Sequence, residues 1–259
     1  MAITGEWTRI GGEVPGFVAA PAGPPPWPAI LVVHAAMGLD HHIEALCASF
    51  AAEGYYTVCP DIYAPDPGFK QHRREDLAIA AHLGADAAKQ EAKLAQYPAD
   101  QQTRIVKARE WMNARQGHTY INTVRAAYDW LSTQSNIRAI GTIGFCMGGR
   151  LVGELTVTGA KLAAGIIHYG GPPKLDLVPK IVTPLEGHYA STDTPITGRI
   201  PAFADAMKAA GKEFSYYVYE ADHGFSIGDT HFPEQAKLAM ERSRKYLAEK
   251  LQPMAAAAE

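Results

Sequence analysis

Residues 29–33, Ala-Ile-Leu-Val-Val, form an unbroken apolar run, and this run restricts the possible fold more than any other feature of the sequence. A strand with one face in water alternates apolar and polar residues, whereas a continuous apolar run is typical of a strand covered on both faces. We expect further strands at 55–59, 139–144, 163–168, 181–187 and 214–219, and helices at 40–53, 120–134, 148–158, 198–210 and 231–250. This alternation predicts an α/β fold with a mostly parallel central sheet and helices on both faces.

Two other stretches complete the predicted organisation. Residues 5–20 read as two short edge strands separated by two glycines. Residues 64–118 are polar and rich in Ala, Gln, Lys and Arg, and we expect them to form two or three helices in an excursion over the edge of the sheet. Because 259 residues are compatible with one domain of this class, we expect residues 1–259 to form a single domain.

Charge and cysteine content restrict the partners and the location. The formal net charge is −3, so no basic surface indicates binding to nucleic acid. The apolar runs are shorter than the ~20 residues of a membrane span, and we recognise no signal peptide. Three widely spaced cysteines without a CxxC pair indicate reduced thiols rather than disulfides or a cysteine zinc site. We expect a cytoplasmic monomer or small homo-oligomer without a metal.

The motif Gly144-Phe145-Cys146-Met147-Gly148 lies where a predicted buried strand meets a predicted helix. It matches the G-x-S-x-G nucleophile elbow with cysteine in place of serine. The glycines have a steric reason, because the turn is strained and backbone segments pass close to it. A cysteine at a helix N-terminus is favoured as thiolate. The backbone N–H of Met147 would point to the position where a carbonyl oxygen becomes an oxyanion.

A nucleophilic thiol needs a base, and the base needs a group that orients it. In this fold the acid and then the histidine follow the nucleophile in the sequence. Asp193 follows the strand expected at 181–187, and His223 follows the strand expected at 214–219. Asp176 precedes the first of these strands, and Asp222 adjoins the histidine, so both are weaker candidates for the acid.

Each candidate also has a structural interpretation. Cys146 could be a small buried residue that tolerates the turn, His223 could be an exposed loop histidine, and Asp193 could form a turn beside Pro195. The remaining cysteines and several histidines are better explained by structure. We interpret Cys47, Cys59, His34 and His168 as core or loop residues, and His41 and His42 as solvent-facing residues at a helix start.

Over roughly residues 5–250 the sequence resembles the dienelactone hydrolase family. The resemblance rests on the combination of Val33-His34 with Gly38-Leu39, Pro60 to Tyr63, Gly144 to Gly149, Asp193 to Ile196, and His223 to Phe225. It implies an α/β-hydrolase fold and a triad of Cys146, His223 and Asp193. It also implies an oxyanion hole made by the backbone N–H groups of Ala36 and Met147. The family hydrolyses enol-lactones and related esters without a metal or organic cofactor.

Two positions depart from the family pattern. The family usually has a glutamate directly after the histidine that ends the first buried strand, where this chain has Ala35. It also has an arginine four residues after the catalytic histidine, where this chain has Ile227. Candidates for another arginine that would bind a substrate carboxylate are Arg73, Arg74, Arg104 and Arg109.

These features predict a hydrolase that cleaves a dienelactone-type ester or lactone through a cysteine nucleophile and a thioester acyl-enzyme. The two departures keep a broader esterase or thioesterase as an alternative. The replacement of the glutamate by Ala35 also leaves a catalytically silent binding protein of the same fold as a further alternative. In the enzymatic interpretations the partner is a small-molecule ester or lactone.

Overall fold

The computed structural model describes residues 5–66, 68–81, 83, 87–114, 120–228 and 230–252. Within these ranges the strands form an eight-stranded sheet in the order β1-β2-β4-β3-β5-β6-β7-β8. All neighbours from β4 to β8 are parallel, and β1 and β2 continue one edge in antiparallel pairing. The strands are β1 Glu6–Ile10, β2 Val14–Ala19, β3 Trp27–Val33, β4 Tyr56–Pro60, β5 Ile137–Phe145, β6 Ala164–His168, β7 Leu185–Ala190 and β8 Phe214–Tyr219. The predicted α/β fold is confirmed.

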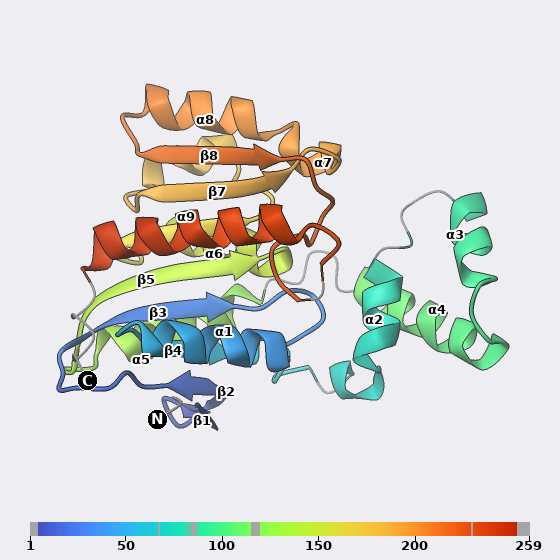
Figure 1. Cartoon of the computed structure of the whole chain (residues 1–259), viewed down its shortest axis with the longest axis horizontal. Coiled ribbons are helices and arrows are strands. Elements are labelled where there is room, and N and C mark those ends of the chain that lie inside the picture. Colours follow the sequence, from blue (N-terminus) through green and yellow to red (C-terminus); the bar gives the residue numbers. More distant parts are fainter. Residues whose placement is uncertain are drawn as a thin grey trace.

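Helices cover both faces of the sheet (Figure 1). On one face, Leu31 and Val33 of β3 pack into a core with α5 Ile121–Ser132 and α6 Met147–Thr156. On the opposite face, Ile30 and Val32 pack into a second core with α1 His41–Ala52 and α9 Pro233–Leu251. This arrangement explains the unbroken apolar run, because successive side chains of a strand point to opposite faces. A smaller core lies between α8 Ile200–Ala209 and the 3₁₀ helix η2 Leu175–Lys180.

Helix α1 shows why these local sequences adopt their structure. The carboxylate of Asp40 accepts hydrogen bonds from the backbone N–H groups of His42 and Ile43, both at 3.1 Å, so it caps the helix as predicted. His41 is exposed and His42 is half-buried. Gly54, with a φ of 97°, follows the helix end. The cap fixes the chain direction directly after the loop that leaves β3.

The polar excursion contains η1 Phe69–Gln71, α2 Arg74–Ala81, α3 Ala87–Leu94 and α4 Ala99–Ala114. The predicted placement of these helices over an edge of the sheet is wrong. They lie beyond the carboxyl ends of the parallel strands (Figure 1). The buried carboxylate of Asp76 accepts a hydrogen bond of 2.9 Å from Arg104 and so joins α2 to α4. Residues 67, 82, 84–86 and 115–119 of the predicted segment lie outside the described residues.

The largest difference from a predicted strand boundary occurs at β7. The strand expected at 181–187 is β7 Leu185–Ala190, and it follows η2. Pro184 accepts a 3.0 Å hydrogen bond from the Gly165 N–H but has no N–H to donate, which explains why the strand begins only at the next residue. Among the described helices, none is long and apolar enough to cross a membrane.

Candidate active site

Cys146 lies between β5 and α6 with φ 55° and ψ −116°, a backbone conformation that side-chain-bearing residues rarely adopt. The neighbouring glycines make this turn possible. A Cβ at Gly144 would lie 2.3 Å from the carbonyl oxygen of Gly148, and a Cβ at Gly148 would lie 2.1 Å from the carbonyl oxygen of Val33. The turn is fixed on its other side by a 2.9 Å hydrogen bond from the Cys146 N–H to His168 O. The predicted strained elbow is therefore present.

The structure brings Cys146, His223 and Asp193 together from three separate loops. His223 Nε2 lies 3.0 Å from Cys146 Sγ, and His223 Nδ1 lies 2.6 Å from Asp193 Oδ2. Both distances are within hydrogen-bonding range. The competing acids are not in this chain of contacts. Asp222 instead accepts a 2.7 Å hydrogen bond from the Thr192 hydroxyl, and Asp176 lies in η2.

The two neighbours of His223 determine its protonation. Burial lowers the pKa of this imidazole, but the hydrogen bonds with Asp193 and Cys146 outweigh burial and raise the pKa from 6.5 to about 10. At neutral pH the ring therefore carries a proton on both nitrogens. Nδ1 donates to the Asp193 carboxylate, and Nε2 donates to the sulfur. A cation in this position, together with the N-terminus of α6, favours the thiolate form of a cysteine.

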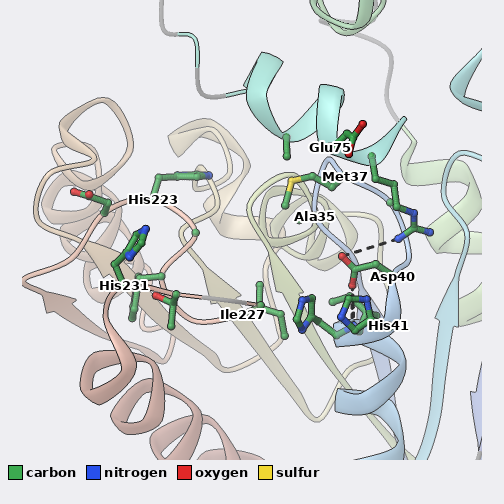
Figure 2. A pocket seen from close by; sticks show the side chains of 18 of the residues that line it. Ala35, Met37, Asp40, His41, Glu75, His223, Ile227 and His231 are labelled. Carbon is green, nitrogen blue, oxygen red and sulfur yellow. Dashed lines mark hydrogen bonds and ion pairs between the residues drawn. The ribbon is translucent and has the colours of Figure 1, made fainter. Parts of the chain in front are cut away.

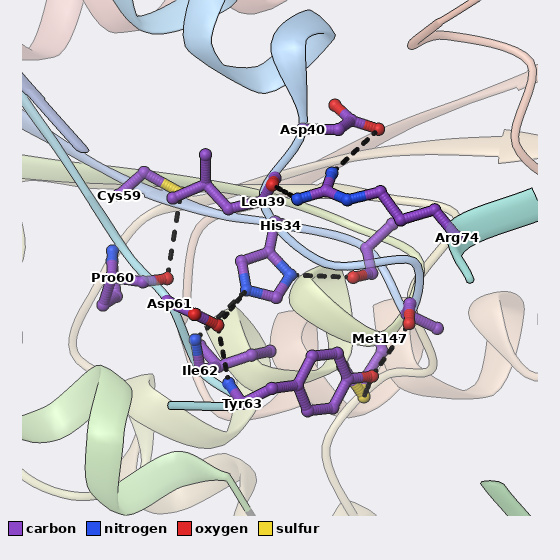
Figure 3. Close-up of polar contacts among 12 residues, drawn as sticks. His34, Leu39, Asp40, Cys59, Pro60, Asp61, Ile62, Tyr63, Arg74 and Met147 are labelled. Atoms are coloured by element: carbon purple, nitrogen blue, oxygen red, sulfur yellow. Dashed lines mark hydrogen bonds and ion pairs between the residues drawn. The ribbon is translucent and has the colours of Figure 1, made fainter. Parts of the chain in front are cut away.

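Both predicted oxyanion donors lie close to Cys146, because Met147 follows it in the chain and Ala36 lines the same cavity. Met147 is the first residue of α6, so its N–H has no carbonyl acceptor within the helix. Ala36 lies in the turn after β3, and the Tyr63 hydroxyl donates a 3.0 Å hydrogen bond to its carbonyl oxygen. The same hydroxyl lies 3.6 Å from Met147 Sδ, so Tyr63 connects both segments (Figure 3). In the sequence, Tyr63 is recognisable only as the end of the Pro60 to Tyr63 motif.

His34 has the structural role that was predicted for it. Its ring is fully buried, and burial lowers its pKa, which keeps it neutral. Nδ1 donates to Ala35 O at 2.8 Å, and Nε2 accepts from the Ile62 N–H at 3.1 Å (Figure 3). The ring thereby joins the loop after β3 to the loop after β4, which carries Tyr63. Cys47 and Cys59 are buried in the core, as expected.

A cavity of about 460 Å³ lies over the thiol of Cys146. The body of the fold contributes Ala36, Tyr169 and Ile196, and the polar excursion contributes Arg109, which is one of the four candidate arginines. The excursion also contributes three residues for which the sequence carries no signal: Ala81, Met112 and Asn113.

The four candidate arginines lie in different parts of the structure, and Arg109 is the one that lines the cavity of Cys146 among the described residues. Arg109 also donates a 2.9 Å hydrogen bond to Ala80 O. Arg104 binds Asp76 and Asp100 within the excursion. Arg73 lies 3.6 Å from the carboxylate of Glu75, and Arg74 lies 4.0 Å from the carboxylate of Asp40 at a neighbouring pocket. Ile227 lines the cavity at the position where the family pattern has an arginine.

Comparisons with known proteins agree with this fold. A "Putative carboxymethylenebutenolidase" of Saccharolobus solfataricus is 26% identical over 92% of this chain and 94% of its own length. The dienelactone hydrolase of Anabaena variabilis is 13% identical, with a TM-score of 0.62 over 97% of this chain and 100% of that one. A dienelactone hydrolase-like promiscuous phosphotriesterase from metagenomic libraries is 17% identical, with a TM-score of 0.70 over 96% and 99%.

These structural similarities show the α/β-hydrolase fold. The sequence comparison goes further, because residues 14–252 match the profile described as "Dienelactone hydrolase family". The match includes the turn between β5 and α6 and the loops that carry Asp193 and His223. The chain therefore belongs to the dienelactone hydrolase family.

Proposed function

We propose that this protein hydrolyses an ester or lactone with Cys146 as the nucleophile, His223 as the proton carrier and Asp193 as the residue that orients it. The observation that carries the proposal is the continuous chain of contacts from Sγ to Nε2 at 3.0 Å and from Nδ1 to the carboxylate at 2.6 Å. Family membership and the name of the Saccharolobus relative support the reaction class.

The proposed reaction has two steps, the formation of a thioester and its hydrolysis. The thiolate of Cys146 attacks the substrate carbonyl, and the N–H groups of Ala36 and Met147 bind the oxyanion. The carbon–oxygen bond to the leaving group then breaks, and the proton on His223 Nε2 passes to the leaving oxygen. A thioester remains. In the second step water gives a proton to His223 and attacks the thioester carbonyl. The carbon–sulfur bond breaks, which releases the acid and restores the thiolate and imidazolium.

The test compares Cys146→Ala with Cys47→Ala, which removes a thiol from the core. Hydrolysis of phenyl acetate and of an enol-lactone should fall at least about 100-fold in Cys146→Ala and persist in the control. An acetyl adduct on Cys146, trapped by acid quench and located by peptide mass spectrometry, should appear during turnover of phenyl acetate. Unchanged hydrolysis by Cys146→Ala would reject the nucleophile. A wild-type protein with neither turnover nor adduct would instead be a catalytically silent binding protein.

A broader esterase or thioesterase is the second candidate, and the cavity lining favours it. Ala35 and Ile227 place apolar groups beside His223 where the family pattern has charged ones, and Arg109 is the arginine that lines the cavity among the described residues. We expect neutral aryl esters to be hydrolysed with a kcat/KM at least equal to that of an anionic dienelactone. A strong preference for the anionic lactone would exclude the broader specificity.

A further inference from the structure

A second cavity of about 760 Å³ adjoins the cavity of Cys146. The two share Ala35, Met37, His223, Gly224 and Ile227 as lining residues. In Figure 2, His223 and His231 lie on one side of this second cavity, Asp40 and His41 lie on the other, and α2 passes above. Its volume is within the range of about 300–1,000 Å³ that is typical of small-molecule sites. The second cavity thus borders the candidate active site.

The boundary between the cavities includes two small residues, Ala35 and Gly224. Ala35 presents a single methyl group to both spaces. Gly224 has a φ of 88°, and a Cβ built on it would meet no atom within 4 Å. Both residues directly flank groups of the proposed mechanism, since Ala35 precedes Ala36 and Gly224 follows His223. A substrate can therefore extend from one cavity into the other beside the imidazole.

The wall of the second cavity suits an uncharged group. Ile43, Phe225 and Phe232 contribute apolar surface. The charged groups at the rim have partners. Asp40 caps α1 and lies 4.0 Å from Arg74. Glu75 lies 3.6 Å from Arg73, and Asp222 accepts a hydrogen bond from the Thr192 hydroxyl. Histidines 41, 42 and 231 add polar edges. A carboxylate would have to compete with Asp40 for the arginine, whereas an aryl or alkyl group would gain by leaving water.

The proposed mechanism decides which part of the substrate lies there. Among the described residues, Cys146 and Ala36 line the first cavity and not the second. The acyl group is bonded to Sγ after the first step, so it stays in the first cavity. The leaving oxygen must take its proton from Nε2 of His223, which borders both spaces. We propose that the second cavity binds the alcohol part of the substrate and selects an uncharged aryl or alkyl alcohol larger than phenol. This inference rests on the proposed function.

Helix α2 offers a direct way to test the placement. Ala78 lines the second cavity, whereas Ala81, about one helical turn further, lines the first. Ala78→Trp should fill the alcohol cavity, and Ala81→Trp should fill the acyl cavity. The exposed Ala88 of α3 provides a matched control for the introduction of tryptophan. Ala78→Leu should give a smaller effect of the same kind as Ala78→Trp and keeps a strong helix former in place.

The kinetic experiment uses two substrate series. The first is phenyl acetate against 4-butylphenyl acetate, which lengthens the alcohol part. The second is phenyl acetate against phenyl hexanoate, which lengthens the acyl part. A buried methylene contributes about threefold to fourfold, so the wild type should prefer the butylphenyl ester by at least about tenfold in kcat/KM. The acyl-chain ratio is the kcat/KM for phenyl hexanoate divided by that for phenyl acetate. Ala78→Trp should abolish the preference for the butylphenyl ester and leave the acyl-chain ratio unchanged, whereas Ala81→Trp should change the acyl-chain ratio. Ala88→Trp should preserve both the preference and the acyl-chain ratio.

A binding measurement makes the result independent of turnover. The wild type should bind 4-butylphenol at least about tenfold more tightly than phenol in calorimetry, and Ala78→Trp should erase the difference. A carboxylate-terminated 4-alkylphenol that binds better than 4-butylphenol would overturn the uncharged class. Equal binding of phenol and 4-butylphenol by the wild type, or a fall in the acyl-chain ratio of Ala78→Trp, would overturn the placement. Tight binding of 4-butylphenol without any ester hydrolysis would refute the proposed function, and the second cavity would then remain only a binding site for uncharged phenols.

Discussion

Replacing Ser243 with alanine removes a hydroxyl group that lies between two buried imidazoles beneath the candidate active site. Ser243 Oγ lies 3.0 Å from His168 Nε2 and 3.1 Å from His188 Nε2, and the two rings stack with their centroids 4.5 Å apart. The hydroxyl hydrogen is donated to Ala239 O at 2.9 Å. Ser243 Oγ must therefore accept from both rings, which places a proton on Nε2 of each one.

The hydrogen-bond network determines how much this substitution costs. His168 is fully buried, and its other nitrogen, Nδ1, accepts a 2.7 Å hydrogen bond from the Ser226 hydroxyl. Without Ser243, its Nε2–H would lose the acceptor it has here. His188 Nε2–H would keep Glu186 Oε1 at 3.0 Å. One stranded buried donor costs about 1–3 kcal/mol. We expect a loss of about 2 kcal/mol, or roughly 4–8 °C in Tm for a chain of this length.

Urea unfolding followed by circular dichroism measures this loss, and Ser132→Ala is the matched control. Ser132 lies on the exposed side of α5 and also donates to a carbonyl of its own helix, Asp129 O, at 2.7 Å. Its replacement should change the free energy of unfolding by no more than about 0.5 kcal/mol. The reasoning is refuted if Ser243→Ala is as stable as Ser132→Ala, because the imidazole would then have found another acceptor or a different tautomer.

Further predictions concern the turn, the oxyanion segment and pH. Gly148→Ala should prevent folding or abolish activity, because its Cβ would lie 2.1 Å from Val33 O, and soluble yield and hydrolysis would show this. Tyr63→Phe should fold normally but lower kcat about tenfold with little change in KM, because Ala36 loses the 3.0 Å hydrogen bond that holds its segment. An unchanged kcat would show that Tyr63 does not position the Ala36 N–H. Burial lowers the pKa of His168 well below 6.5, so the unfolded chain binds more protons below that pH. Tm should therefore fall from pH 6.5 toward about pH 5, and less steeply in His168→Gln.

The contacts of the candidate triad could be predicted because they follow from local rules. The glycines around Cys146 indicate a turn that excludes a Cβ, and the distances at Gly144 and Gly148 show the same exclusion in space. The order of Asp193 and His223 follows from loops at the carboxyl ends of parallel strands, which meet at one edge of the sheet. Their roles in catalysis remain predictions.

The hydrogen-bond network around His168 could not be predicted, because its members are far apart in the chain. Taken singly, His168 looked like a core or loop histidine, and it is indeed fully buried. Its partners Ser226 and Ser243 are 58 and 75 residues away, and neither has a recognisable motif. The excursion was placed wrongly for a similar reason. Its helices show their own apolar positions in the sequence but not the surface on which they pack.

The proton on His223 connects the geometry of the site to the kind of ester that the proposed mechanism can cleave. Asp193 and the sulfur raise the pKa of this imidazole to about 10, so in the proposed mechanism the ring already holds its proton before the attack. Because the imidazolium holds its proton so strongly, it is a weak acid toward the oxygen of the leaving group. Leaving groups that carry negative charge well, such as enolates and phenolates, need little help from it, whereas simple alkoxides need a full proton transfer. In the proposed mechanism these contacts therefore favour activated esters, which fits an enol-lactone and the aryl members of the alcohols assigned to the second cavity.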